Sequence, residues 1–508
     1  MNLENNIFAL LAAQASANNN PLVPGLICHP LALAELAAAK NGKVYGVAWD
    51  MANSQCQRTK DAKSITTDTT NFKHSGRVNT SYSNPFDLIY PWSGRKLCNI
   101  DIEAYMGLQS GDKITDCVTY WEGDAGFSYS DPYGVWVYTP KFWGRSYLDN
   151  GYRHFEVTGV RKSGWTAYPE MITGRWLGVK KALTIGGTSK NCNLPTLGIS
   201  VSGGTVSEGM SVQHGYASNY GGSLVDIYAL DASLLLFVVE YATLNTQNAL
   251  GNGVTDLYDQ ATVHPAAAVT AGTEVSFSGL SAAQIGDFIP GAIIDFGTSS
   301  GGAQEGRTSI VSASTSEGVT TVELADAVTV TTDSFASIHG LMNLADSEIG
   351  GKSGYIGTNG KSNAYYRGEA MWGNKWQYIL GAYRQTGTGK IWIAADSAAA
   401  AVKDALDTNV HTDTGLVLPE NASNYILTLG MCDGLSIPPF GLTIAGNATN
   451  PVGDYVYTPA LTTGNTVLRL GGHANDGTSA GGFYGYWYSV AGYSYWSGGS
   501  RPRLLNPS

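Results

Sequence analysis

The spacing of hydrophobic and polar positions changes several times along this chain. Residues 5–17 and 30–40 are rich in Ala and Leu, which favour helix, and the sequence NNNPLVPG between them breaks it. After Gly42 the pattern shortens to β-type runs such as KVYGVAW and YGVWVYTPKFW, divided by clusters of Gly, Asn, Asp and Ser. We therefore predict that residues 1–41 form a helical segment for attachment or oligomerisation, and that β-structure follows from residue 42.

One later stretch has a helical period. From Ser223 to Leu250 the apolar positions recur every three and four residues and become nearly continuous at LLLFVVEY, which predicts a single helix buried in the core. Gly251 and Gly253 follow this stretch, and glycine commonly ends helices.

The composition shifts again between residues 255 and 345. Runs such as GTEVSFSGL, GAIIDFGTS and GVTTVELADAVTV are rich in Val, Thr and Ser, and Trp is absent although it is frequent on both sides. A Tyr- and Trp-rich texture returns at YYRGEAMWGNKWQYILGAY and continues to the last residues. We predict a mostly β protein of the α+β kind, in which one domain (42–254 and 346–508) is split by an inserted β-module (255–345).

Composition narrows the classes of function. Charged residues make up 14% of the 508 residues, the net charge is −11, and no basic block is present, so a nucleic-acid partner is not expected. No apolar run approaches the roughly 20 residues of a membrane-spanning helix, so we expect no membrane insertion. The run Ile7–Ala17 lacks a basic segment before it, which favours an amphipathic helix over an export signal.

The six cysteines are widely spaced and form no C-x-x-C pair, which argues against a zinc site. We expect buried free thiols, and one or two long-range disulfides are the alternative. The cysteines are Cys28, Cys56, Cys98, Cys117, Cys192 and Cys432.

Signals for catalysis are scarce. The eight histidines are scattered, and the chain has neither an EF-hand-type calcium loop nor a phosphate-binding loop. Glu122 and Asp124 in YWEGDAG are the best acids for glycoside hydrolysis, but one strand cannot place carboxylates on both sides of a glycosidic bond. Glu240 lies in the predicted core helix, where we expect a backbone donor or an Arg to pair with it. We expect no catalytic residues, no metal and no cofactor.

The stretch GGFYGYWYSVAGYSYWSGG (481–499) has the composition of a binding surface. Eight of the fourteen residues from Phe483 to Trp496 are aromatic, and most of the others are Gly, Ser or Ala. Tyr and Trp supply rigid amphipathic contact area, and Ser, Gly and Asn supply adaptable hydrogen bonds, as in antibody binding loops. A Tyr-rich seam between subunits is the alternative. We predict one contiguous face, on a backbone that Gly485 and Gly492 allow to bend. The side chains expected to be largely exposed on it are Tyr484, Tyr486, Tyr488, Tyr493 and Tyr495.

Several segments, taken in order along residues 42–508, resemble phage and prophage proteins of the C-type-lectin fold. The upstream segments are PFDLIYPWSGRKLCNI, VWVYTPKFW, FVVEYATLNTQNALGNGV and YRGEAMWGNKW. The C-terminal segment fits the family pattern R-x-G-G, G-x-x-A-G-x-F and G-x-R. The matching residues are Arg469, Gly471, Gly472, Gly477, Ala480, Gly481, Phe483, Gly499 and Arg501.

The resemblance implies a C-type-lectin-like domain and a receptor-binding protein at the tip or fibre of a phage tail, assembled in the host cytoplasm and carried by the virion. In relatives that are diversified by retroelements, the residues of the C-terminal run vary, and the same residues bind the ligand. By this resemblance Phe483, Trp487 and Trp496 are scaffold residues or central anchors. The residues that it assigns to ligand binding are Ala474, Asn475, Asp476, Tyr484, Tyr486, Tyr488, Ser489, Tyr493, Tyr495 and Ser497.

The partners implied are a host cell-surface receptor, either protein or glycan, and other tail proteins that contact residues 1–41. We also expect a homotrimer, because multivalent display strengthens weak sites. A structural virion protein with a Tyr-rich seam and a tail-associated glycan depolymerase are the alternatives.

The chain also departs from two groups of proteins with the same fold. Formylglycine-generating enzymes share the YRGEAMWGNKW element but need C-terminal catalytic cysteines, and no Cys follows Cys432. Only Asn475 and Asp476 match the second calcium-binding triplet of animal lectins, and no Trp precedes them. We therefore expect this chain to have neither that enzymatic activity nor calcium-dependent sugar binding.

Overall fold

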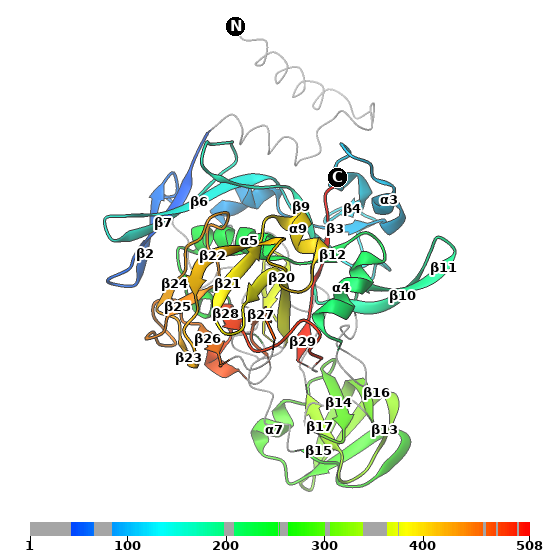
Figure 1. The fold of residues 1–508 in the computed structure, drawn as a ribbon. Coiled ribbons are helices and arrows are strands. Elements are labelled where there is room, and N and C mark those ends of the chain that lie inside the picture. Colours follow the sequence, from blue (N-terminus) through cyan, green and yellow to red (C-terminus); the bar gives the residue numbers. More distant parts are fainter. Residues whose placement is uncertain are drawn as a thin grey trace.

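The protein is mostly β, as predicted (Figure 1). The predicted helical segment 1–41 lies outside the described residues. This computed structural model describes residues 42–65, 84–197, 208–251, 253, 263–299, 305–338, 363–373, 375–460, 464–473, 476–494 and 497–507.

The first sheet has five antiparallel strands, and its inner strands pack against a central helix, α5 (Ile227–Tyr241). Val47, Trp49 and Phe155 are buried there because they face the helix side of the sheet. The strand order is β2 (Gln55–Lys60), β1 (Tyr45–Asp50), β7 (Tyr152–Thr158), β6 (Phe142–Asp149) and β8 (Thr166–Tyr168).

The second sheet joins the two ends of the domain. Its C-terminal strand lies between strands that come from the first half of the chain, so the last described residues close a sheet that forms much earlier in the sequence. The order is β12 (Ser223–Leu224), β30 (Pro502–Leu504), β9 (Met171–Gly174), β5 (Trp136–Thr139), β3 (Lys96–Ile100) and β4 (Val118–Trp121).

The third sheet carries the C-terminal aromatic stretch. Most of its neighbouring strands are antiparallel, and β26–β28 and β20–β29 are parallel pairs. The order is β22 (His411–Val417), β21 (Lys390–Ala394), β20 (Trp376–Arg384), β27 (Thr466–Gly471), β28 (Gly481–Tyr486), β26 (Tyr455–Thr458) and β23 (Ala422–Tyr425), and β29 (Gly498–Gly499) pairs with β20.

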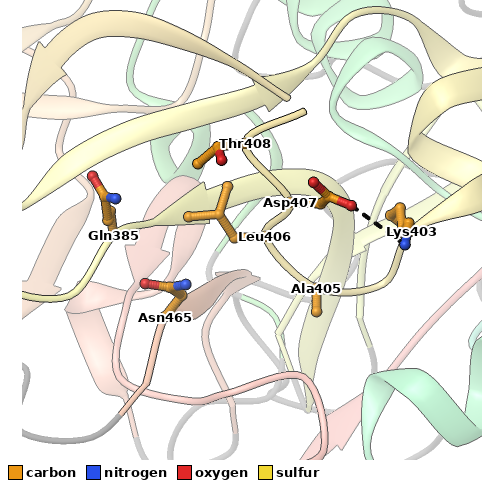
Figure 2. A pocket seen from close by; sticks show the side chains of 7 residues that line it. All are labelled: Gln385, Lys403, Ala405, Leu406, Asp407, Thr408 and Asn465. Carbon is orange, nitrogen blue, oxygen red and sulfur yellow. Dashed lines mark ion pairs between the residues drawn. The ribbon is translucent and has the colours of Figure 1, made fainter. Parts of the chain in front are cut away.

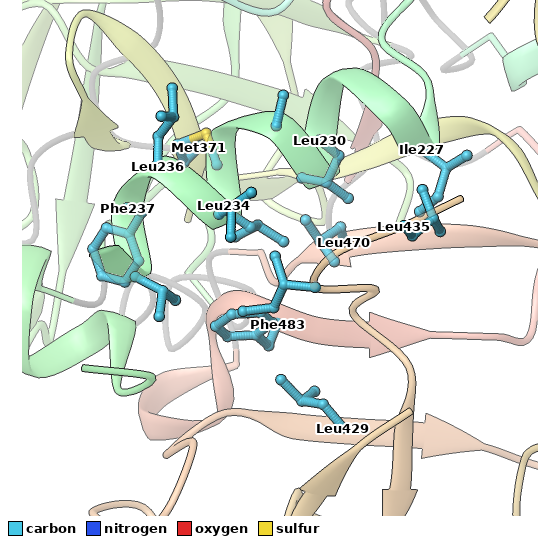
Figure 3. Close-up of a cluster of buried hydrophobic side chains, with 14 of the residues drawn as sticks. Ile227, Leu230, Leu234, Leu236, Phe237, Met371, Leu429, Leu435, Leu470 and Phe483 are labelled. Carbon is cyan, nitrogen blue, oxygen red and sulfur yellow. The ribbon is translucent and has the colours of Figure 1, made fainter. Parts of the chain in front are cut away.

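The central helix forms the main core between the first and third sheets. Asp226 caps its first turn by accepting hydrogen bonds from the backbone of Tyr228 (3.1 Å) and Ala229 (2.8 Å). Figure 3 shows apolar residues of α5, including Leu230 and Leu234, facing Leu470 and Phe483 of the third sheet. One face of the third sheet is therefore buried against α5, and its opposite face is not part of this contact.

The prediction of a single helix from Ser223 to Leu250 is wrong. The chain begins that range as β12, forms α5, and then breaks at Ala242, whose φ of 52° is left-handed. A second helix, α6 (Thr246–Leu250), follows. Asn245 is its N-cap, and the Asn245 side chain accepts a hydrogen bond from the Asn248 backbone at 2.9 Å. Gly251 ends α6 with a φ of 79°, as its position predicted.

The remaining elements of the body are short. Its hairpins are β10 (Val179–Ile185) with β11 (Thr188–Leu194), β18 (Ala364–Tyr366) with β19 (Glu369–Trp372), and β24 (Thr428–Leu429) with β25 (Gly441–Thr443). Its other helices are α3 (Ile102–Gly107), α4 (Met210–Ser218), α9 (Ser397–Val402), η2 (Pro85–Leu88), η3 (Trp92–Gly94), η4 (Ile114–Cys117) and η6 (Gly477–Ser479).

The described part of the predicted insertion is a separate five-stranded unit, seen at the bottom of Figure 1. It has its own apolar core, and the Ala336 backbone donates to Val263 at 2.9 Å, so its entry and exit lie side by side. Ile293 of this module contacts Leu177 of the body. The predicted boundaries at 254 and 345 lie outside the described residues. Its elements are β13 (Val269–Ser278), α7 (Ala282–Gly286), β14 (Ile293–Gly297), β15 (Gly306–Ser316), β16 (Val319–Val330) and β17 (Phe335–Ile338).

Glu240 is a buried carboxylate that connects three distant segments of the body. It pairs with Arg367 at 2.6 Å, as expected for a helix carboxylate matched by an Arg, and accepts from Asn84 and Tyr366 at 2.7 Å. Tyr366 and Arg367 belong to the segment YRGEAMWGNKW, Glu240 lies in FVVEYATLNTQNALGNGV, and Asn84 directly precedes PFDLIYPWSGRKLCNI. The motifs therefore meet around one charge in the core.

Glu369 is a second buried carboxylate of this kind. It pairs with Arg95 and Arg501 and accepts from Ser233 at 2.7 Å and Thr173 at 3.0 Å. Burial alone would raise the pKa of Glu369, but Arg501 and Arg95 hold it at about 2. The C-terminal segment is thereby bound to the N-terminal half of the domain.

The five cysteines among the described residues are free thiols, which confirms the prediction for them. Cys98, Cys117 and Cys192 are buried, Cys56 and Cys432 are partly buried, and Cys28 lies outside the described residues. In the described parts of the chain, no helix is both long and apolar enough to cross a bilayer.

Candidate ligand-binding surface

Strand β28 has two different faces. Phe483 and, just after the strand, Trp487 are completely buried in the main core, whereas Tyr484, Tyr486 and Tyr488 alternate with them on the opposite side. Gly485 lies on the core side, where a Cβ would come within 3.0 Å of the Trp487 indole nitrogen. Gly485 therefore leaves room for the Trp487 ring in the core.

The tyrosines of β28 belong to a larger aromatic layer on the face of the sheet that points away from α5. Tyr378, Arg469, Tyr486 and Tyr457 form one row across four neighbouring strands. A second row is joined by ring contacts of Tyr484 with Trp376 (4.6 Å) and Tyr455 (5.7 Å) and of Tyr455 with Tyr425 (5.1 Å). We call the following residues the aromatic face: Trp376, Tyr378, Tyr425, Tyr455, Tyr457, Arg469, Tyr484, Tyr486, Tyr488 and Tyr493.

Arg469 is the cation of the aromatic face. Its guanidinium carbon lies 4.3 Å from the ring centroid of Tyr486, 5.5 Å from Trp376, 5.8 Å from Tyr493 and 6.0 Å from Tyr378. Only 3% of the residue is exposed, and its Nε and Nη1 atoms have no hydrogen-bond partner among the described residues. Surrounding rings stabilise such a desolvated cation by about 2 kcal/mol or more. The charge therefore depends on the rings for much of its stabilisation.

The segment after β28 folds back over the sheet and is bound to it by hydrogen bonds to the carbonyl groups of its backbone. The Val467 amide donates to Ser489 at 2.9 Å, the Tyr378 hydroxyl donates to the Tyr493 carbonyl at 2.8 Å, and the Trp376 amide donates to Ser497 at 2.7 Å. Tyr488 and Tyr493 rise from this segment with 51% and 36% of their surface exposed. Their positions are thus set by a backbone that is attached on both sides.

The structure corrects part of the predicted exposure. Tyr484 is only 5% exposed, because Trp376 and Tyr455 pack against it, and burial raises its pKa well above the usual value. Tyr486 is half-buried, and burial, partly opposed by Arg469, raises its pKa to about 12. Tyr488 and Tyr493 are exposed as predicted.

The serines assigned to ligand binding are also corrected. Ser489 and Ser497 are buried, because the segment that carries them lies flat on the sheet. Neither side chain can reach a ligand at the surface in this structure. Phe483 and Trp487 are buried, which agrees with their expected role as scaffold.

Asp476 lies at the edge of the aromatic face. Its carboxylate accepts hydrogen bonds from the His473 backbone and from His473 Nδ1, and the His473 ring stacks on Trp376 with centroids 5.8 Å apart. The carboxylate therefore orients a ring at this edge. Ala474, Asn475, Tyr495 and Trp496, also singled out from the sequence, lie outside the described residues.

Five aromatic residues of this surface were not predicted from the sequence: Trp376, Tyr378, Tyr425, Tyr455 and Tyr457. The alternation in DYVYT around Tyr455 and Tyr457 is a signal for two outward phenols on one strand. Nothing in the sequence, however, shows that this strand lies next to β28.

The acids considered for glycoside hydrolysis lie in the turn after β4. There Asp124 accepts from the Trp121 backbone at 2.8 Å, which holds the turn closed. Among the described residues, no group of three or more His, Cys, Asp or Glu side chains is placed to hold a metal ion.

No protein-family model matches this sequence, and no curated protein matches it either. What the chain binds is therefore inferred from its geometry.

Proposed function

We propose that this protein is a receptor-binding protein of a phage tail, built on a C-type-lectin-like domain, and that it recognises a host cell-surface ligand through the aromatic face. One observation carries the proposal. Tyr488 and Tyr493 stand exposed on a layer of interlocked rings and a buried cation, on the side of a sheet whose other side forms the main core. Exposed apolar surface of this kind marks interaction sites.

The arrangement suits binding energetically. A ring that is already held by its neighbours loses little conformational freedom when a partner arrives, so more of the contact energy remains as affinity. Exposed Tyr residues are also frequent hot spots, where one side chain contributes about 2 kcal/mol or more. Tyr488 contacts Tyr486 at 6.2 Å between centroids, and Tyr486 in turn stacks on Tyr457 at 4.8 Å. The outer rings are thus pre-positioned.

A subunit seam in a structural virion protein is the second candidate, because Val490, which lies between Tyr488 and Tyr493 in the sequence, is also exposed and adds apolar area to the same segment. Such a seam would bury these residues between copies of the chain. The two functions differ in what a surface change does: a seam variant changes the oligomeric state, whereas a receptor-site variant changes only binding to cells.

The test is the double variant Tyr488→Ser/Tyr493→Ser, with Tyr120→Ser as the control. Tyr120 is similarly exposed but lies on β4, outside the aromatic face. The labelled proteins would be assayed for binding to a panel of bacterial strains, together with melting temperature and mass by light scattering. We expect the double variant to lose cell binding with unchanged melting and mass, and Tyr120→Ser to bind normally. Unchanged cell binding would overturn the proposal, and a fall in mass would favour the seam.

A further inference from the structure

A cavity of about 350 Å³ lies at the edge of the third sheet, where β20 ends and β27 begins. A loop of residues 403–408 forms its other wall (Figure 2). Its size is within the range of small-molecule sites, about 300–1,000 Å³. The lining residues are Gln385, Lys403, Ala405, Leu406, Asp407, Thr408 and Asn465.

The two amide side chains in this cavity have their oxygens already occupied. Gln385 Oε1 accepts from Thr388 Oγ1 at 2.9 Å and from the Trp392 indole at 3.3 Å. Asn465 Oδ1 accepts from the Thr386 backbone at 3.0 Å. Figure 2 shows the amide nitrogens of Gln385 and Asn465 on the side that faces the 403–408 loop. Both amides therefore present donors to the cavity.

Asp407, the acidic side chain of the cavity, makes its hydrogen bonds and its ion pair within its own loop. Asp407 Oδ1 accepts from the backbone of Asn409 at 3.0 Å and from its side chain at 3.1 Å, and Oδ2 pairs with Lys403 Nζ at 3.3 Å. The hydrogen bond from the Asn409 backbone, with help from Lys403, lowers the pKa of Asp407. The Lys403 side chain is 46% exposed and keeps further N–H groups for a ligand. The cavity is thus rich in donors and poor in free acceptors.

We infer that this cavity binds an acidic sugar, whose carboxylate accepts from Lys403 and the two amides. A carboxylate accepts up to about four hydrogen bonds, which matches several nitrogen donors around one space. The Thr408 hydroxyl serves sugar hydroxyls, and Leu406 offers a small apolar surface to the carbons of the ring. Leu406 is the one large apolar side chain among the lining residues, so a sugar acid fits this lining better than an acidic peptide with apolar side chains.

The cavity adjoins the segment that carries the exposed Tyr488 and Tyr493. Gly464, next to Asn465, lies so close to this segment that a Cβ on it would be 3.2 Å from Val490 Cγ1. One glycan chain could therefore contact the cavity with its acidic unit and the exposed Tyr488 and Val490 with its neighbouring units. The inference names the ligand class of the proposed receptor surface and to that extent rests on the proposed function.

The experiment measures binding of sodium glucuronate to the full chain by ligand-observed NMR, with glucose, acetate and a glutamate-rich peptide as comparison probes. Two variants, Gln385→Glu and Asn465→Asp, keep the oxygens that accept from Trp392, Thr388 and Thr386 but replace the donor nitrogen by an acceptor. We expect glucuronate to bind at least about tenfold more tightly than each comparison probe. Each variant should weaken glucuronate binding by at least about tenfold.

Two control variants match the charge changes. Asn447→Asp adds the same charge at an exposed position whose side-chain oxygen likewise accepts backbone hydrogen bonds. Lys390→Gln matches Lys403→Gln, because Lys390 is 44% exposed and pairs with Asp413. Lys403→Gln should weaken glucuronate binding, and both controls should bind it normally. Equal binding of glucose or the peptide, or normal binding by the Gln385 and Asn465 variants, would overturn the inference.

The double variant Tyr488→Ser/Tyr493→Ser separates this inference from the proposed function. It should bind free glucuronate normally while losing cell binding. If the wild-type chain does not bind glucuronate but the Tyr variant still loses cell binding, the acidic subsite is wrong and the receptor proposal stands. If glucuronate binds but the Tyr variant keeps full cell binding, the receptor proposal fails and the cavity remains a sugar-acid site.

Discussion

The guanidinium carbon of Arg469 lies 4.3 Å from the ring centroid of Tyr486, its cross-strand neighbour. Neither residue is among the most exposed on the aromatic face, but both contact the exposed rings of this face. Tyr493 lies over the same guanidinium, and Tyr488 contacts Tyr486. The aromatic face therefore has two levels, a buried one that holds the outer rings in place and an exposed one that is open to solvent. These levels should respond differently to mutation.

Tyr484→Ser tests the buried level. Because this ring is packed between Trp376 and Tyr455, its loss should leave a cavity and lower the free energy of unfolding by about 3 kcal/mol or more. Tyr488→Ser, four residues along on the same side of the chain, should change it by no more than about 0.5 kcal/mol. Urea unfolding of both variants measures the difference. Equal stability losses would contradict the two-level arrangement.

Glu369→Gln should be among the most destabilising single changes in the body. It removes the carboxylate from between Arg95 and Arg501 and leaves buried cations uncompensated, at a cost of about 3–5 kcal/mol. The matched control is Asp413→Asn, which breaks the exposed pair with Lys390 and should cost at most about 1 kcal/mol. The measurement is again urea unfolding at neutral pH, and a cost below that of the control would rule out a structural role for the buried pair.

The same carboxylate predicts acid sensitivity. The pKa of Glu369 is about 2 in the folded protein, against an ordinary 4.5, so the folded state binds fewer protons there than the unfolded state. Its contribution is fully present above about pH 4.5 and is lost as the pH falls towards 2. The difference in unfolding free energy between the wild type and Glu369→Gln should therefore shrink across this window. A difference that stays constant down to pH 3 would show that the group has no such shift.

Asp454 should make the free energy of unfolding depend on pH in the opposite direction. Burial raises its pKa to about 8, so the folded state holds a proton that the unfolded state loses near pH 4. This group therefore destabilises the fold as the pH rises from about 4 to 8. Asp454→Asn, similar in shape to the protonated acid, should be nearly neutral at low pH but more stable than the wild type at pH 9. Thermal melting at pH 5 and pH 9 tests this, and equal effects at both would refute it.

The inserted module should be separable from the body. Its apolar core comes from its own residues, and its entry and exit are joined by the hydrogen bond between Ala336 and Val263. Replacing residues 263–338 with a short Gly/Ser linker should leave the body folded, with a small loss from exposing Leu177, which Ile293 covers. Circular dichroism and a single cooperative melt would show this. Collapse of the body would mean that the two units fold as one.

The alternation of β28 could be predicted from the sequence, since Phe483 and Trp487 alternate with phenols at a period of two. The burial of Tyr484 could not, because its cover comes from Trp376 and Tyr455 on strands far away in the chain. The helix break at Ala242 was also missed: the apolar period continues past it, and only Asn245 signals a new N-cap. The role of Arg469 depends on cross-strand register, which no local pattern reveals.

The segment that carries the exposed tyrosines lies in the chain between two parts of the core. Strand β28 precedes it, and β29 and β30 follow it. Arg501 completes the partners of Glu369, and Arg503 pairs with Asp226 at the start of α5. A chain cut short by a stop codon or a frameshift within the segment lacks both arginines and the strand that closes the second sheet. Completing the fold therefore requires translation through the whole segment that carries Tyr488 and Tyr493, because the ion pairs and the strand that close the body come after it.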